Sequence, residues 1–269
     1  MGHTRLGSIP KTQKWKSVVS LIAGEKSSGG GSAVLLADDI ENVAIQALDA
    51  AQNGLKAAIE DIGLQYVFYM LTQLVLSARL EDWQAQLENL GVHLQEDATV
   101  FDLTAEFQNV IDDYLLEHSR TSDVSEIAQK AAGEAIAALA SVEQLSLLNS
   151  SRDELQTVIR SLSTKNGFSQ LGQVFFGRFM ARFLNFYLSR VTAAHLDGDR
   201  LPQVGDITKF NQALQRHCEQ SARIVYEFCG QWYSKTEFQE GIDLYKSSRF
   251  MAVALKKLQA ELKQQRGEV

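Results

Sequence analysis

Arg190 and His195 are the two residues whose types and spacing best suit catalysis. Four residues separate them, near the end of an expected helix. Histidine suits general acid–base chemistry because its unperturbed pKa of about 6.5 lies near neutral pH. A structural role explains the same pair, because two cations near the C-terminal end of a helix interact favourably with its dipole. We favour the structural role and keep catalysis as an alternative.

The stretch from Arg190 to His195 is similar to the motif of HEPN-type ribonucleases. In that family the arginine and the histidine face a second copy of the motif, and together they assist attack by the RNA 2′-hydroxyl group. The resemblance implies a metal-independent ribonuclease with Arg190 and His195 as its catalytic residues. The family favours a polar residue directly after the arginine, whereas this chain has Val191 there.

A cluster of carboxylates lies in another expected helix, at Asp112, Asp113 and Glu117, with His118 beside them. Paired carboxylates and a histidine can bind a metal ion, but a di-iron bundle requires Glu-x-x-His on two helices. The sequence contains no such motif. A solvated acidic face explains these residues better. We therefore expect no metal ion and no cofactor.

A polar face with two arginines accompanies the most aromatic segment, residues 168–196, and consists of Arg178, Arg182, Asn185 and Ser189. Cations beside aromatic rings can bind nucleic acid through phosphate contacts and base stacking. Aromatic residues at helical spacing are more typical of a core, however, and the net charge of −7 repels a polyanion. We therefore do not expect nucleic acid as a partner.

The elements that position these residues are expected to be helices. Apolar residues recur with a period near 3.6 along almost the whole chain, and strand-like alternation is nearly absent. The sequence predicts an all-α fold, a multi-helix bundle of about nine or ten helices with a long C-terminal helix. One helix is expected over residues 34–60 and one from Asp206 past Trp232. Ser151 and Glu154 predict a capping box at the start of another.

Composition divides the chain into three regions. Residues 1–33 are expected to form a basic N-terminal arm, a short helix and a Gly/Ser linker. Residues 34–196 are expected to form the main helical bundle. Residues 197–269 are expected to form a C-terminal helical region that packs on the bundle as one domain.

One segment, residues 62–80, is long and apolar enough to raise the question of a membrane. Polar side chains recur along one stripe of it, which favours the central helix of a soluble bundle. The alternative is a membrane-active pore-forming effector that exposes residues 62–80 and 168–188. The N-terminus carries no secretory signal, and Cys218 and Cys229 suit a reducing compartment. We expect a cytoplasmic protein without a membrane partner.

Charge is sorted by position along the chain. Residues 1–26 carry five basic and one acidic side chain, residues 27–163 carry six and twenty-two, and residues 164–269 carry fifteen and ten. A strongly acidic middle therefore lies between two basic ends. Such segregation indicates that some surface meets an opposite charge, in another copy, in another partner or in another part of the same chain.

The two basic ends supply the candidate binding residues. In the N-terminal arm, Lys14 and Lys16 flank Trp15, a possible anchor on a partner. In the last helix, Arg249, Lys256 and Lys263 are spaced by seven residues and form a cationic stripe. Beside this stripe runs a heptad-like apolar seam, which predicts a coiled-coil type of packing. The seam consists of Leu244, Met251, Leu255, Leu258 and Leu262.

These observations favour a non-catalytic interaction or assembly protein, which is our main prediction. It would self-associate or dock on a larger complex through its basic ends and acidic middle. The expected partner is a protein or a second copy of the chain. The ribonuclease with Arg190 and His195 is the first alternative, and the pore-forming effector is the second.

Overall fold

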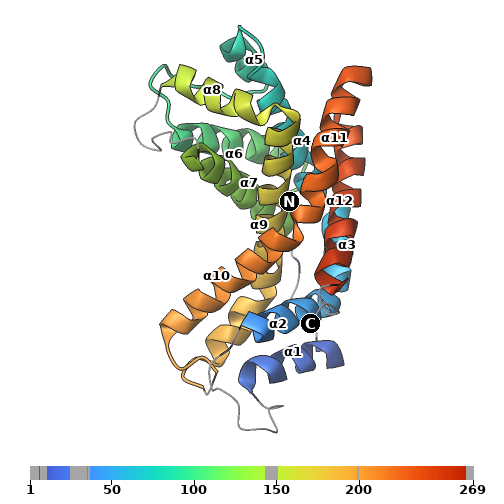
Figure 1. Ribbon diagram of the computed structural model, residues 1–269. Coiled ribbons are helices and arrows are strands. Elements are labelled where there is room, and N and C mark those ends of the chain that lie inside the picture. The colour runs from blue at the N-terminus through green and yellow to red at the C-terminus, as the bar shows by residue number, and fades with distance from the viewer. Residues whose placement is uncertain are drawn as a thin grey trace.

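The computed structural model describes residues 6, 11–24, 35, 37–142, 151–198 and 200–264. These residues form 12 helices and no β-strand, which confirms the prediction of an all-helical bundle (Figure 1). The helices are α1 (Gln13–Ala23), α2 (Ala37–Ala50), α3 (Gln52–Ile59), α4 (Ile62–Ser77), α5 (Trp83–Asn89), α6 (Val100–Glu117), α7 (Asp123–Val142), α8 (Arg152–Leu162), α9 (Lys165–Ala194), α10 (Val204–Ser221), α11 (Arg223–Glu240) and α12 (Leu244–Gln264).

The predicted number of nine or ten helices was wrong because two expected helices are each broken in two. Residues 34–60 contain α2 and α3, which meet at Ala51, and the helix expected from Asp206 divides into α10 and α11 at Ala222. At these alanines ψ is 10° and −5°, so each break takes a single residue close to helical geometry. The apolar period continues through both breaks, which is why it does not reveal them.

Two helix starts illustrate how local sequence sets the boundaries. The predicted capping box of α8 is present: the Ser151 amide donates to Glu154 Oε2 at 2.8 Å, and the Glu154 amide donates to Ser151 Oγ at 3.3 Å. The helix that was expected to start at Asp206 begins at Val204 as α10, so Asp206 does not lie at its start. It instead lies one turn inside, where its Oδ2 accepts from the Gln203 amide at 3.1 Å.

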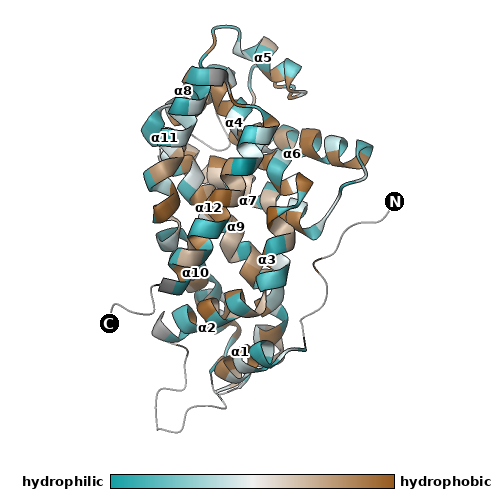
Figure 2. Ribbon diagram, turned by 90° about the vertical axis from the view of Figure 1, so that its right-hand side faces the viewer, coloured by the Kyte–Doolittle hydropathy of each residue, from teal (hydrophilic) through white to brown (hydrophobic). Residues whose placement is uncertain are grey.

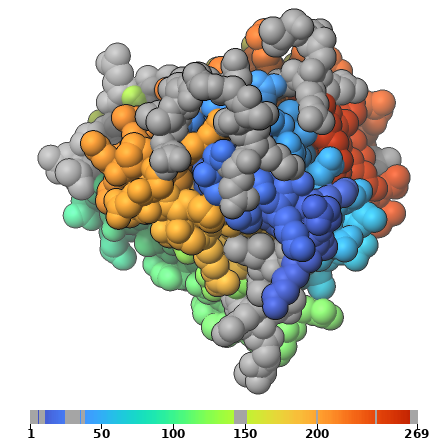
Figure 3. All heavy atoms as spheres, turned by 90° about the horizontal axis from the view of Figure 1, so that it is seen from below, coloured from blue at the N-terminus to red at the C-terminus, as the bar shows by residue number. Residues whose placement is uncertain are grey.

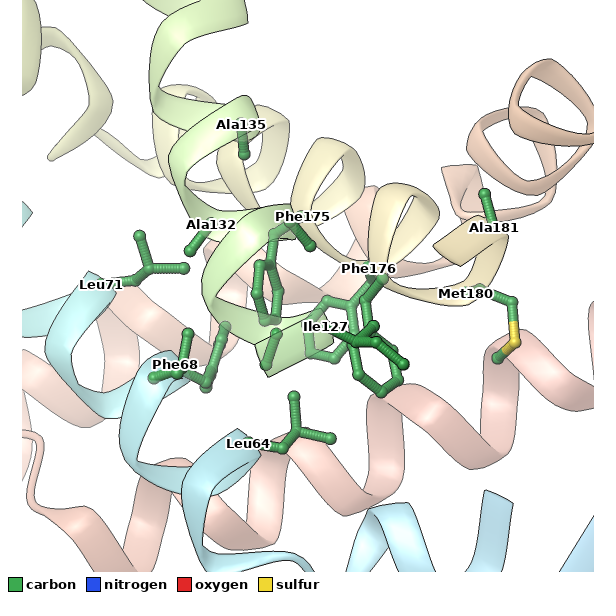
Figure 4. Packing of buried hydrophobic residues seen from close by; sticks show 14 of the residues in the cluster. Leu64, Phe68, Leu71, Ile127, Ala132, Ala135, Phe175, Phe176, Met180 and Ala181 are labelled. Atoms are coloured by element: carbon green, nitrogen blue, oxygen red, sulfur yellow. The ribbon is translucent and has the colours of Figure 1, made fainter. Parts of the chain in front are cut away.

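The centre of the molecule is α9, which has 30 residues and is the longest described helix. α7, α10 and α11 pack along it. Figure 4 shows Phe175 and Phe176 of α9 beside Phe68 of α4, and the Phe68 and Phe176 ring centroids are 5.3 Å apart. The C-terminal helix α12 has 21 residues. The long helix of this fold is therefore in the middle of the chain.

The apolar seam of α12 is used inside the chain. Met251, Leu255, Leu258 and Leu262 are all buried in the core, and α12 packs against α4 and α11. The expected coiled-coil packing is therefore not found: the seam faces the protein's own helices and offers no apolar stripe to another copy.

The segment considered for a membrane, residues 62–80, forms α4 in the interior of the bundle. Its polar side chains have partners within the fold: Gln73 Nε2 donates to the Ile242 carbonyl at 3.0 Å, and Ser77 Oγ accepts from Trp83 Nε1 at 3.1 Å. Most of residues 168–188, in α9, are likewise buried. Within the described ranges, no helix combines the length and the apolar character that crossing a membrane requires.

One cluster of buried apolar residues extends from Trp15 in α1 to Leu262 in α12. Brown, apolar residues alternate with teal, hydrophilic ones along most helices in Figure 2. Figure 3 shows α1 (dark blue) against the segment around α10 (orange) at one end of the molecule. The regions 34–196 and 197–269 thus share a core, while their boundaries stay predictions.

Candidate functional site

The Arg190 and His195 pair lies at the C-terminal end of α9. Arg190 is exposed, and His195 is the partly buried residue that ends the helix. His195 Nδ1 donates to the Val191 carbonyl at 2.8 Å. Both side chains occupy the position at which cations interact favourably with a helix dipole. Catalysis by this pair stays a prediction.

The three candidate binding residues of the N-terminal helix differ in exposure. Lys14 and Lys16 are exposed on α1, whereas the Trp15 side chain between them is 1% exposed. The Trp15 ring lies 5.5 Å from the Tyr187 ring of α9. Trp15 therefore anchors α1 to the protein's own core and is not available to a partner in this conformation.

The three residues of the cationic stripe on α12 have different environments. Lys263 Nζ is 2.6 Å from Asp49 Oδ1 of α2, so this cation is paired within the chain. Lys256 is exposed. Arg249 is exposed and lies in a groove, with its guanidinium group 5.7 Å from the centre of the Tyr245 ring. The sequence predicts that these three residues lie along one side of a helix. In the structure each of them has different surroundings.

The groove lies between α11 and α12 and has a volume of about 710 Å³. It combines aromatic, cationic and uncharged polar side chains from both helices. The lining residues are Phe228, Gln231, Trp232, Lys235, Thr236 and Gln239 of α11, and Tyr245, Lys246, Arg249, Phe250 and Val253 of α12.

Aromatic rings form the apolar surface of this groove. The Trp232 and Phe250 rings are stacked with centroids 4.1 Å apart, and Phe228 lies 5.5 Å from Phe250. Tyr245 is 67% exposed and Val253 is 48% exposed, although both are large apolar residues. Contiguous exposed apolar surface of this kind is typical of binding sites.

The charges of the groove have one sign. Lys235, Lys246 and Arg249 are its cations, and none of the described residues that line it is acidic. Lys246 Nζ donates to the Gly241 carbonyl at 3.0 Å and lies 3.8 Å from an oxygen of Asp243. Lys235 and Arg249 have no ion pair within the described part of the chain. Two cations are therefore directed to solvent beside the aromatic surface.

Sequence reasoning identified only part of this site. Arg249 was singled out, but nothing connected it with Lys235 or with the rings of α11. The sequence does contain a signal for this groove, namely a regular spacing of aromatic and cationic residues on both helices. Trp232, Lys235 and Gln239 follow one another at three and four residues on α11, and Tyr245, Arg249 and Val253 at four residues on α12.

The polar face of α9 is neutralised within the chain. Glu134 of α7 accepts hydrogen bonds from Arg182, one of them from Nε at 3.1 Å, and also lies 3.6 Å from Arg178 Nη1. Arg178 Nε is in turn 3.4 Å from an oxygen of Glu219. The adjoining cavity of about 160 Å³ has room for a few water molecules. These arginines join α7, α9 and α10.

The cysteines and the acidic cluster singled out in the sequence are not among the residues that line the groove. Burial raises the pKa of the Cys218 and Cys229 thiols far above its usual range, so neither supplies a thiolate at neutral pH. Asp112 of the acidic cluster accepts a hydrogen bond from Gln129 Nε2 at 2.8 Å. Searching the described residues for three or more His, Cys, Asp or Glu side chains that could hold a metal ion finds no such group.

In the groove between α11 and α12, exposed aromatic surface thus lies beside two cations that form no ion pair with any described residue. Comparison of the chain with protein-family models, with curated proteins and with solved structures finds no match.

Proposed function

We propose that the protein is a non-catalytic interaction or assembly protein, which docks an acidic segment of a protein partner in the α11–α12 groove. The observation that carries this proposal is the charge of the groove. Three cations and no described carboxylate line it, although the chain as a whole has a net charge of −7. A concentration of positive charge on an acidic protein favours an acidic partner and raises its association rate.

The aromatic surface supplies the affinity that charge alone does not. Trp232 and Tyr245 belong to the residue types that contribute most to protein interfaces, and so does Arg249. An acidic segment that also carries apolar side chains would bury these rings while its carboxylates pair with Lys235 and Arg249. Burial of apolar surface contributes about 25 cal/mol per Å².

The length of the groove suits a helical segment. Its α11 side runs from Phe228 to Gln239, which is about 17 Å along a helix axis. This length corresponds to about three turns of a bound helix. A helix that lies in a groove between two others presents its anchors at three- and four-residue spacing, the same spacing as the lining residues on α11 and α12.

A designed peptide tests the proposal. The probe is a synthetic amphipathic helix with Leu at three- and four-residue spacing and Glu at the flanking positions. We expect it to bind and to shift the ¹H–¹⁵N signal of the Trp232 indole more than those of Trp15 and Trp83, which are buried elsewhere. The double variant Lys235→Glu/Arg249→Glu should weaken binding at least about tenfold, because two attractive contacts become repulsive.

The controls separate the groove from general charge effects. Lys56→Glu/Arg216→Glu changes the net charge equally, on exposed residues of α3 and α10, and should leave the affinity within about twofold. A peptide with Lys in place of Glu should not bind. Equal binding of the Glu and Lys peptides, or unchanged binding by the groove variant, contradicts the proposal.

A further inference from the structure

One helix of this chain has the chemistry that the groove requires. α6 carries five carboxylates in 18 residues and no basic side chain. Its inner face, which includes Leu103, Phe107 and Ile111, is buried against the bundle. Its outer face is acidic. The carboxylates are Asp102, Glu106, Asp112, Asp113 and Glu117.

The outer face of α6 also carries two exposed apolar residues. Phe101 is 51% exposed and Leu116 is 57% exposed, at opposite ends of the helix. A separation of 15 residues places them within about 60° of each other around the helix axis and about 22 Å apart along it. The groove is about 17 Å long, so it can take Leu116 together with the neighbouring carboxylates Asp113 and Glu117, but not Phe101 as well.

The two surfaces lie on different sides of the molecule. In Figure 1, α6 is on the left and α11 and α12 are on the right, and in Figure 2 they are again on opposite sides. α6 packs against α7 and α4. The outer face of α6 therefore cannot reach the groove of its own copy, and the charge match can be made only between copies.

We propose that the occupant of the groove is α6 of a second copy, so that the protein self-associates head to tail. In this contact Asp113 and Glu117 of one copy approach Lys235 and Arg249 of the next, and Leu116 packs against the rings of Tyr245 and Trp232. The contact joins two different surfaces, so each added copy leaves one groove and one α6 free. Such contacts produce rings or open chains.

This inference rests on the proposed function and goes further by naming the partner. Charge attraction between exposed groups is screened over about 8 Å at physiological salt. We therefore expect the weight-average molar mass to rise with protein concentration in low salt and to fall when about 0.5 M salt is added. Sedimentation equilibrium measures both dependences on the full chain.

Two one-sided variants test the contact itself. Lys235→Glu/Arg249→Glu disables the groove and leaves α6 intact, whereas Asp113→Lys/Glu117→Lys disables α6 and leaves the groove intact. The second pair lies in the last turns of α6, where cations favour the helix dipole, so the variant should remain folded. Circular dichroism and the thermal midpoint verify folding of both.

Mixing the variants gives the decisive result. Each variant alone should be a monomer. Together they should associate again, because a groove meets an α6 of opposite charge only when the two come from different variants, so the mixture should reach a molar mass that neither variant reaches alone. Glu60→Lys/Glu88→Lys, which changes two exposed acidic residues outside α6, should assemble like the unmodified chain.

Two results overturn the inference. One is an unmodified chain that stays a monomer at about 100 µM in low salt, since a contact of ordinary affinity would be populated there. The other is a pair of variants that each still assemble alone. If the groove nevertheless binds the Leu/Glu peptide, the proposed docking function stands and only its assignment to a second copy fails. If the peptide also fails to bind, both are wrong.

Discussion

At the scale of single residues, burial determines what a side chain can do. Trp15 resembles a partner anchor in the sequence and is an internal anchor in the fold. His217 of α10 is similar: its Nε2 is buried and has no hydrogen-bond partner among the described residues. Burial lowers the pKa of His217 below the usual 6.5, while the nearby Glu41 carboxylate partly opposes the shift. The folded protein therefore favours the neutral ring.

This shift predicts a loss of stability in weak acid. The unfolded chain binds a proton at His217 near pH 6.5, whereas the folded chain does so only at lower pH. The contribution of His217 to the free energy of unfolding should therefore be at its maximum above about pH 6.5 and should decrease as the pH falls through that value. Urea unfolding at about pH 8 and about pH 5 measures the decrease.

The His217→Gln variant should reduce this dependence on pH, because the side chain no longer titrates. His93 is exposed on a loop, so His93→Gln serves as the matched control and should leave the dependence unchanged. A His217→Gln variant that loses as much stability in acid as the unmodified chain would show that other groups are responsible.

At the scale of elements, close approach between helices depends on glycine. Gly230 of α11 lies against the start of α9, and its amide donates to Ser169 Oγ at 3.1 Å. A Cβ atom at position 230 would overlap the Lys165 carbonyl oxygen. α9 and α11 are consequently packed backbone to backbone at this point. The apolar period predicts both helices but contains no information about their separation.

Gly230→Ala should destabilise the protein by about 1–3 kcal/mol, because α11 must move away from α9 to admit one methyl group. Gly205→Ala is the matched control. Nothing lies within 4 Å of a Cβ atom at position 205, in the first turn of α10, so that change should be neutral or stabilise by up to about 1 kcal/mol. Thermal and urea unfolding of the two variants provide the comparison; equal effects would contradict this account of the α9–α11 contact.

At the scale of the whole molecule, part of the charge segregation is resolved within one chain. Several ion pairs join the basic C-terminal third to the acidic middle, among them Lys263 with Asp49, Arg200 with Asp39, and Arg182 with Glu134. Among the residues that the structure describes, the groove cations Lys235 and Arg249 and the outer carboxylates of α6 form no such ion pair. The proposed contact between copies therefore uses charged groups that do not form ion pairs between described residues of one chain.

The ion pairing between the basic C-terminal third and the acidic middle can be tested at Glu134, which contacts two arginines of α9. Glu134→Gln should lower the free energy of unfolding by about 1 kcal/mol, a small value because the group is partly exposed. The loss should be greater in low salt, since Arg178 and Arg182 then repel each other with less screening. Glu81→Gln, on an exposed residue, should have little effect at either salt concentration. A Glu134→Gln loss that does not vary with salt would argue against this electrostatic role.

The sequence by itself determined the helical class, the α8 capping box, the buried stripe of α12 and the order of charges along the chain. These properties depend on residues within a few turns of one another, so periodicity and local hydrogen bonding reveal them. The helix breaks at Ala51 and Ala222 were not predicted, because a single residue near helical geometry interrupts a helix without changing its apolar pattern. Only the tertiary structure decided which cations form ion pairs within the described part of the chain. It brought Lys235 of α11 beside Arg249 of α12, buried Trp15, and turned α6 away from the groove, because these relations depend on the packing of segments around α9 and not on spacing along the chain.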